Sequence, residues 1–255
     1  MLHCLAVADG RIRIGIGGWT YPPWRGVFYP EGLAQRKELE YASQQLTAIE
    51  INATFYGRQS EKSWKTWAET VPDDFQFAIK ASRFCVMRSK LCEGAEGISN
   101  FFAQGFAVLG PKLGPILWQF APRRTFDADD IDGFIKLLPE KLDGLELRHA
   151  IEPRHESFHD ERFFKLCRDR NIAIAFEDSD EYPTIDMDTA DFAYARLQRM
   201  REGVATGYEG AALDTFAARA KRWSREGRDS YVFMINGAKV RAPAAARALR
   251  VRLAV

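Results

Sequence analysis

Short apolar runs alternate along this chain with longer segments in which apolar residues recur at helical spacing. The short runs predict strands over residues 12–16, 47–52, 75–80, 115–120, 144–148, 172–177, 192–197 and 231–236. The segments between them predict helices over residues 33–45, 61–70, 97–109, 127–138, 161–170, 213–225 and 243–252. After the sixth strand the pattern becomes irregular, with at most one turn of helix near residues 184–190.

Eight strands separated by helices favour a parallel sheet. A chain of 255 residues has the usual length of one TIM-type (β/α)8 barrel. We therefore predict an α/β fold with one barrel domain over residues 1–255, irregular after strand six. The competing fold is an open doubly wound sheet, which often begins with a glycine-rich phosphate loop. The segment from Gly15 to Gly18 lacks the later glycine of that loop and runs into Trp19 and Tyr21, so the barrel is favoured.

Seven of the apolar runs end in a charged or amide residue. Burying an unpaired charge costs several kcal/mol, so these seven ends need a common explanation. Side chains two positions apart on a strand share a face, which pairs Glu50 with Asn52 and Glu146 with Arg148. The C-terminal ends of parallel barrel strands meet at one end of the barrel, its mouth, where the active sites of TIM barrels lie. The residues predicted at the mouth are Glu50, Asn52, Lys80, Gln119, Glu146, Arg148, Asp178, Arg196 and Asn236.

The predicted mouth combines carboxylates with arginines. Glu50 and Glu146 are the predicted acid–base pair, and Asp178 is the third predicted catalytic residue, as an orienting carboxylate. Arg148 should keep one carboxylate ionised while a more buried partner stays protonated. The arginine fork suits phosphate and carboxylate groups, which predicts a small anionic or sugar-like ligand. The predicted substrate-binding residues are Trp19, Asn52, Lys80, Gln119, Arg148, His149, Arg196 and Asn236.

Several alternatives stay open for the same residues. The carboxylates and cations could neutralise one another in a structural network. A divalent cation could bind there, because hard cations take carboxylate ligands, but the nearby cations oppose it and we predict no cofactor or metal. The ligands of such a site would be Glu50, Glu146, Asp178 and His149. Lys80 could form a Schiff base or pair with Glu50, while His149 and the aromatic loop around Trp19 could simply be packing residues.

Composition and charge are those of a soluble globular protein, with 46% hydrophobic residues, 28% charged residues and a net charge of +1. Residues 192–255 hold 13 Lys and Arg against 5 Asp and Glu. Few aromatics are interleaved there, which favours a solvated helix face over a nucleic-acid surface.

Cellular location follows from three further features of the sequence. No apolar stretch reaches the roughly 20 residues of a membrane span, and residues 1–5 lack the basic segment of a signal peptide. The four cysteines, Cys4, Cys85, Cys92 and Cys167, have neither CxxC nor zinc-ligand spacing. We predict a cytoplasmic protein with isolated, reduced thiols and no membrane partner.

Several sequence segments resemble the YecE-like family, also described as domain of unknown function 72. The matching segments are IGIGGWTY (14–21), WRGVFYP (24–30), EINATFY (50–56), FAIKA (77–81), LGPILWQF (113–120), ELRH (146–149), DS (178–179) and FAYARL (192–197). The resemblance spans nearly the whole chain and implies a TIM-type barrel without an established reaction. The chain departs from the family pattern twice. Cys85 to Met87 stand near the place of a frequent Thr-His pair, and Asn236 to Lys239 replace an Asn-Asn segment.

Together these features predict a barrel enzyme acting at the mouth on a small phosphorylated or glycosidic substrate, as a hydrolase or an isomerase. The alternative is a protein without catalysis, which binds a ligand or serves as a nucleic-acid-associated scaffold.

Overall fold

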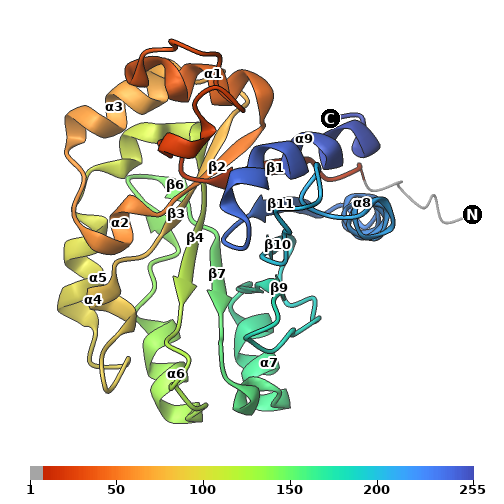
Figure 1. Ribbon diagram of the computed structural model, residues 1–255. Helices are drawn as coiled ribbons and strands as arrows, with labels where there is room; N and C mark the ends of the chain where they lie inside the picture. The colour runs from red at the N-terminus through yellow and green to blue at the C-terminus, as the bar shows by residue number, and fades with distance from the viewer. Residues whose placement is uncertain (1–7) are drawn as a thin grey trace, which may run out of the picture.

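A computed structural model describes residues 8–255 and contains one nine-stranded parallel sheet (Figure 1). The strands run in the order β8-β7-β4-β3-β2-β1-β11-β10-β9. Their bounds are β1 Ile12–Gly17, β2 Ala48–Ile51, β3 Gln76–Lys80, β4 Leu113–Gln119, β7 His149–Glu152, β8 Ala173–Ile174, β9 Phe176–Asp178, β10 Phe192–Leu197 and β11 Asp229–Met234. Cys4 and the apolar start of the chain lie outside the described residues.

The sheet closes through β8 and β9, which lie on either side of Ala175. β8 pairs with β7, whereas β9 pairs with β10, and the Ala175 N–H donates to the Ile151 carbonyl oxygen at 2.8 Å. Taken as one interrupted strand, β8 and β9 complete the eight strand positions of a TIM-type barrel. The predicted fold is therefore confirmed.

The predicted fifth strand is wrong in position. Residues 141–146 form a small antiparallel hairpin of β5 (Lys141–Leu142) and β6 (Leu145–Glu146) outside the barrel sheet. Asp143 and Gly144 take positive φ values of 48° and 83° and make a tight turn between them. An Asp-Gly pair favours such a turn, so the chain reverses there and enters the barrel only at β7.

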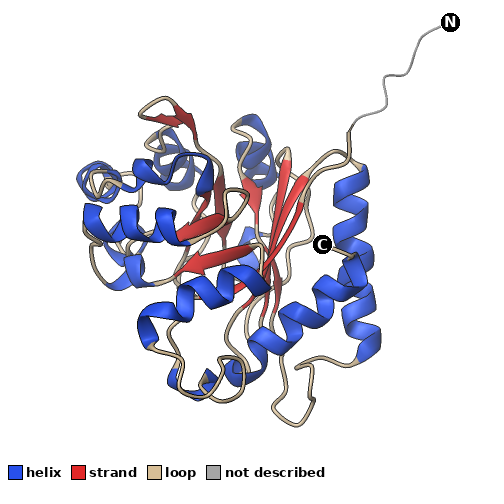
Figure 2. Ribbon diagram, turned by 90° about the horizontal axis from the view of Figure 1, so that it is seen from above, coloured by secondary structure: helices blue, strands red, loops and turns tan. Residues whose placement is uncertain are grey.

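Helices surround the sheet (Figure 2). The α-helices are α1 Glu38–Gln45, α2 Ala53–Tyr56, α3 Glu61–Thr70, α4 Arg83–Val86, α5 Ala95–Phe102, α6 Ala128–Lys136, α7 Glu161–Asp169, α8 Gly210–Arg225 and α9 Ala242–Leu253. Asp127 caps α6, as its spacing predicts, by accepting from the N–H groups of Asp129 and Asp130. Residues 184–190 form no helix, so the β/α alternation is interrupted after β9.

Two apolar layers hold the barrel together. Outward-facing residues such as Ile14, Ile49 and Phe77 pack beneath the helices. The interior layer combines small residues of β2, β3, β7 and β8 with aromatic residues of β10 and β11. Its members are Ala48, Ala78, Leu117, Ala150, Ala173, Ala175, Phe192, Tyr194, Tyr231, Phe233 and Ile235. The alanines leave the space that the larger rings fill, so the middle of the barrel is closed and the mouth lies above a packed floor.

Two further predictions concern membranes and thiols. Within residues 8–255 none of the helices combines the length and apolarity needed to cross a bilayer. Cys85 and Cys167 are buried and Cys92 is partly buried, all three as free thiols. Burial raises the pKa of the Cys85 thiol to about 12, so this thiol is a packing group.

Candidate functional site

A layer of charged and amide side chains lies directly above the apolar interior, at the C-terminal ends of the strands. Strand alternation places these side chains inward, two positions beyond the interior alanines on several strands. Six of them are buried, each on a different strand: Glu50 on β2, Lys80 on β3, Gln119 on β4, Glu152 on β7, Glu177 on β9 and Arg196 on β10. The mouth of the barrel is therefore strongly polar.

Arg196 lies at the centre of this layer and is only 1% exposed. Its Nε and Nη2 donate to the two oxygens of Glu50 at 3.0 and 3.1 Å, and its Nη1 donates to Glu152 Oε2 at 2.5 Å. The Tyr194 hydroxyl also donates to Glu50 Oε2, at 2.7 Å. Each of these charges has lost its water, so it depends on the others for compensation.

Glu152 is the second anchor of the layer. Its Oε1 accepts from Gln119 Nε2 at 2.9 Å and from Arg154 Nε at 2.6 Å. Burial alone would raise the pKa of Glu152, but the guanidinium groups of Arg196 and Arg154 hold that pKa well below its usual range. Glu152 is therefore an ionised structural carboxylate at neutral pH.

Glu177 behaves in the opposite way although it lies close by. Burial and the neighbouring Glu152 carboxylate raise the pKa of Glu177 above its usual range. Gln198 donates to Glu177 Oε1, and Arg154 Nη2 lies 3.6 Å from the same oxygen. Its other oxygen, Oε2, is buried without a hydrogen-bond partner within the described chain. We therefore read Glu177 as a protonated carboxyl group.

Lys80 differs from its neighbours because it lacks a carboxylate partner. In residues 8–255 no Asp or Glu oxygen lies within salt-bridge distance of its amine, and Glu50 bonds to Arg196 instead. The alternative in which Lys80 pairs with Glu50 is wrong. The Lys80 Nζ lies 4.3 Å from the centre of the Phe55 ring. Burial, followed by the positive charge of Arg196, lowers the pKa of Lys80 to about 8.

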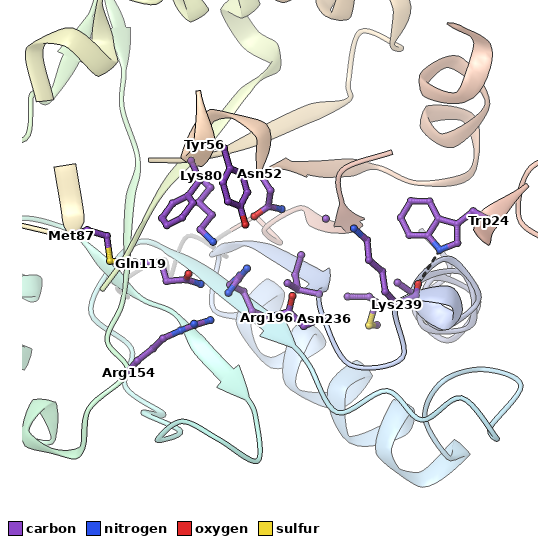
Figure 3. A pocket seen from close by; sticks show the side chains of 15 residues that line it. Trp24, Asn52, Tyr56, Lys80, Met87, Gln119, Arg154, Arg196, Asn236 and Lys239 are labelled. Carbon is purple, nitrogen blue, oxygen red and sulfur yellow. Dashed lines mark hydrogen bonds between the residues drawn. The ribbon is translucent and has the colours of Figure 1, made fainter. Parts of the chain in front are cut away.

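A cavity of about 430 Å³ opens above this layer (Figure 3). Its lining includes the cations Lys80, Arg154, Arg196 and Lys239, and the amides Asn52, Gln119 and Asn236. No Asp or Glu residue of the described chain lines it. The rest of the lining is mostly apolar or aromatic: Gly17, Trp24, Phe55, Tyr56, Met87, Met234, Ile235 and Ala242. The cavity therefore presents positive charge and hydrogen-bonding amides to a ligand.

Lys239 comes from the segment after β11 and lies against an aromatic loop. Its Nζ is 4.7 Å from the Tyr21 ring centre and 5.7 Å from that of Trp24. The Trp24 indole N–H donates to the Lys239 carbonyl oxygen at 2.9 Å, which attaches the segment to the loop. Burial lowers the pKa of Lys239. In Figure 3 Lys239 lies across the view from Lys80, with Arg196 and Asn236 between them.

The structure brings together six of the residues that the sequence placed at the mouth. Asn52, Lys80, Gln119, Arg196 and Asn236 line the cavity. Glu50 lies just beneath them, bonded to Arg196. Their roles in binding or catalysis stay predictions, but their shared location follows from the strand-end pattern.

Glu146 and Arg148 do not lie at the mouth, and that part of the prediction is wrong. The Glu146 side chain is 71% exposed on the hairpin and pairs with Lys141 at 2.5 Å. Arg148 precedes β7 and donates to Asp229 at 2.8 Å, at the N-terminal end of the barrel. The cause is the misplaced fifth strand. The predicted acid–base pair of Glu50 and Glu146 therefore lies at opposite ends of the barrel.

Asp178, His149 and Trp19 also lie away from the cavity. Asp178 ends β9 on its outer face, where it accepts from Tyr208 at 2.8 Å and pairs with Arg199. Trp19 packs edge-on against Trp67, with ring centres 5.0 Å apart.

His149 is a buried packing residue. This agrees with the alternative that the sequence left open beside a role in substrate binding. It accepts from Trp118 Nε1 at 3.0 Å, and its Nε2 lies 2.8 Å from the Pro139 carbonyl oxygen. Burial lowers the pKa of His149 to about 4. The four ligands of the metal alternative are thus dispersed, and the described chain holds no group of three or more His, Cys, Asp or Glu side chains arranged to hold a metal ion.

Four residues of the site were missed from the sequence: Glu152, Arg154, Glu177 and Lys239. The run Ala150-Ile151-Glu152 has the same apolar-to-charged ending as the others, but the misplaced fifth strand hid it. Glu177 adjoins the predicted Asp178, and the inward-facing Ala173 and Ala175 show the alternation that also places Glu177 inward. Lys239 lies in the segment that departs from the family pattern, so no motif marked it.

Comparison with known proteins agrees with this architecture. The family described as "Protein of unknown function DUF72" matches residues 13–255. The UPF0759 protein YunF of Bacillus subtilis (strain 168) is 33% identical over 116 residues, which are 44% of this chain. That match spans 40% of YunF, less than half the length of this relative.

Solved structures share the fold at lower identity. A DUF72 family protein from Thermotoga maritima has a TM-score of 0.76 and 24% identity, over 94% of this chain and 97% of that chain. A sugar phosphate isomerase/epimerase from Parabacteroides distasonis has a TM-score of 0.56 and 11% identity, over 98% and 97% of the two chains. At these identities the likeness concerns the barrel and not its chemistry.

Proposed function

This chain belongs to the DUF72 family of proteins of unknown function, and from that premise we propose that it is an isomerase of small phosphorylated, polyhydroxylated substrates. The proposal rests on one observation. A lysine with a pKa of about 8 faces a cavity that is lined by three further cations and three amides, and by no carboxylate of the described chain. The shared barrel of a sugar phosphate isomerase/epimerase is compatible with this reaction but does not assign it.

The cations of the cavity supply the binding energy for a phosphate group. Arg196 is already neutralised by Glu50 and Glu152. Lys80 and Lys239 have no ion-pair partner among residues 8–255, so a dianionic ligand can neutralise them. Lys239 is the proposed phosphate contact, since it lies across the cavity from Lys80 (Figure 3). The amides supply donors and acceptors for hydroxyl groups.

Lys80 is the proposed base. At neutral to mildly alkaline pH a substantial fraction of its amine is unprotonated, because burial and Arg196 lower its pKa. The neutral amine takes the proton from a carbon next to the substrate carbonyl, which leaves an enediolate. Gln119 and Arg154 line the cavity as donors for the enediolate oxygens. The Lys80 ammonium then returns the proton to the neighbouring carbon, while the hydroxyl proton of the enediolate passes from one oxygen to the other. The carbonyl thereby moves by one position and Lys80 is neutral again.

Two competing functions receive less support. Glycoside hydrolysis by a carboxylate pair needs two carboxyl groups beside the substrate, whereas Glu50 and Glu152 hold Arg196 beneath the cavity. A nucleic-acid scaffold needs free basic side chains on α8. There Arg219 pairs with Asp186 at 2.6 Å and Arg222 with Asp188 at 2.9 Å, so part of that surface is neutralised.

The test is proton exchange. Aldose and ketose phosphates are incubated with the protein in ²H₂O, and NMR follows the incorporation of deuterium next to the carbonyl. Lys80→Met should lower the exchange rate by at least about 100-fold, the usual contribution of a general base. Lys62→Met, an exposed lysine on α3, is the matched control and should leave the rate unchanged.

The pH profile supplies the second part of the test. The logarithm of the wild-type rate should rise with pH and level off above about pH 8, as Lys80 loses its proton. Exchange that is equally fast in Lys80→Met, or absent with every sugar phosphate in the wild-type protein, would refute the proposal. Inactivation by borohydride that requires substrate and is lost in Lys80→Met would instead show that Lys80 bonds covalently to the carbonyl carbon.

A further inference from the structure

A second cavity of about 430 Å³ lies at the opposite end of the barrel, where the strands begin. We call it the N-terminal cavity. It is lined by Arg11, Arg13, Gln76, Gly110, Pro111, Leu113, Gly114, Leu145, Glu146, Arg148, Asp229 and Tyr231. These residues belong to the starts of β1, β3, β4 and β11, and to the approach to β7. The packed interior layer separates this cavity from the mouth, so the two cannot share one ligand.

Three arginines bring positive charge to this cavity. Arg148 pairs with Asp229, Nη1 to Oδ2, at 2.8 Å. Arg11 and Arg13 have no ion-pair partner among the residues that the structure describes. The other lining carboxylate, Glu146, is bound by Lys141 at 2.5 Å. The arginines therefore exceed the carboxylates that could neutralise them.

Arg13 is unusual because it is 7% exposed, and such burial normally requires a charge partner. Its Nη1 donates to the Asp74 carbonyl oxygen at 2.9 Å, whereas its Nε is buried without a hydrogen-bond partner. An incompletely satisfied guanidinium at the edge of a cavity is stabilised by a nearby anion. Within the described chain no carboxylate oxygen lies within ion-pair distance of Arg13, and the nearby Asp229 is already bound by Arg148.

Arg148 is held in position by its neighbours before any ligand arrives. The hydroxyl of Tyr231 accepts from Arg148 Nη1 at 3.1 Å and itself donates to Gln76 Oε1 at 2.5 Å. The guanidinium also lies 5.5 Å from the centre of the Phe192 ring. Asp229 Oδ1 accepts from the Arg11 backbone N–H at 2.8 Å, so both oxygens of this carboxylate are already used. A pre-positioned guanidinium loses little entropy when it binds a ligand.

From these contacts we infer that the N-terminal cavity is a second ligand site, which binds a small oxyanion bearing phosphate or carboxylate groups. Arg11 and Arg148 contact the anion directly, and the buried Arg13 adds its charge from below. Phosphate and carboxylate each present a pair of oxygens that can accept two parallel hydrogen bonds from the planar arginine fork. The inference is independent of the isomerase proposal, because the two sites lie at opposite ends of the barrel.

The experiment is a titration of the full chain with inorganic phosphate and, separately, with acetate at low ionic strength. Backbone amide shifts are followed by NMR. Binding of either oxyanion at the N-terminal cavity should move the signals of Gly110 and Gly114, which line it. These shifts should persist in Lys239→Ala, a change confined to the mouth. Shifts restricted to mouth residues such as Gly17 would overturn the inference.

Two substitutions test the arginine contacts. Arg11 is exposed, so Arg11→Ser should preserve the fold and weaken binding at the N-terminal cavity about tenfold, as expected for one charged hydrogen-bonding group. Arg36→Ser, an exposed arginine in the 3₁₀ turn Gln35–Lys37, is the matched control and should bind like the wild type. Glu146→Gln should strengthen binding about twofold, because it removes a negative charge from the rim. Equal affinity of Arg11→Ser and wild type would overturn the inference.

Discussion

Replacing Lys80 by methionine should stabilise the folded protein at neutral pH. Lys80 is 9% exposed, and its pKa falls from 10.5 to about 8 on folding. This difference corresponds to about 3 kcal/mol of free energy that disfavours the buried ammonium. Methionine has a similar length, carries no charge and can pack against Phe55. The free energy of unfolding of Lys80→Met should therefore exceed that of the wild type by up to about 3 kcal/mol at pH 7.

The sign of the pH dependence follows from linkage. Because the folded-state pKa is the lower one, the unfolded chain binds more protons between about pH 8 and 10.5, and wild-type stability rises with pH there. The destabilisation by Lys80 is complete below about pH 8 and is lost as pH rises toward 10.5. The advantage of Lys80→Met should consequently shrink from about 3 kcal/mol at pH 7 to about 1 kcal/mol at pH 10.

Urea unfolding followed by far-UV circular dichroism at both pH values measures these differences. Lys62→Met on α3 serves as the control, because its lysine is exposed and its substitution should change stability by less than about 0.5 kcal/mol. A Lys80→Met protein that is less stable than the wild type at pH 7 would refute the reasoning. So would an advantage that stays the same from pH 7 to pH 10.

Three further outcomes follow from the same contacts. Binding of a phosphorylated ligand at the mouth should raise the pKa of Lys80. Calorimetry near pH 8.5 in buffers of different ionisation enthalpy should therefore detect proton uptake on binding. Binding without proton uptake would mean that the ligand lies elsewhere. Glu50→Gln should lower the free energy of unfolding by about 3 kcal/mol because Arg196 loses a buried partner; a thermal or urea melt equal to that of the wild type would contradict this. Glu146→Gln should change the free energy of unfolding by less than about 1 kcal/mol, because the ion pair of Glu146 with Lys141 is exposed. The same substitution should leave the proton-exchange activity nearly unchanged, and a large loss of activity would show that Glu146 takes part in the mechanism.

The periodicity of the chain was sufficient to predict the barrel. Every predicted strand but the fifth overlaps a strand of the barrel sheet, and the interruption after β9 falls where the pattern becomes irregular. Strand periodicity is a local property, because the interior and helix-facing positions must alternate. The fifth predicted strand is wrong because the Asp143-Gly144 turn at its start reverses the chain into the hairpin of β5 and β6.

The candidate site was predictable only where strand and alternation were both correct. Glu50, Asn52, Lys80, Gln119 and Arg196 satisfy both conditions and meet at the mouth. The sequence pattern predicts Asp178 at the mouth, where the structure has its neighbour Glu177. A shift of one residue along a strand turns the side chain to the other face of the sheet. Placing the fifth strand at residues 144–148 instead of His149–Glu152 put Glu146 and Arg148 at the mouth in place of Glu152.

The sequence by itself determined which residue types end the strands, and hence that charged and amide groups meet at the mouth of a barrel. Only the tertiary structure decided how those charges pair. Glu50 is bound by Arg196, which lies 146 positions later in the chain, and this leaves Lys80 without a carboxylate. The low pKa of Lys80 therefore could not be predicted from the residues next to it in the sequence. It arises because burial removes water from the amine and folding brings the charge of Arg196 close to it.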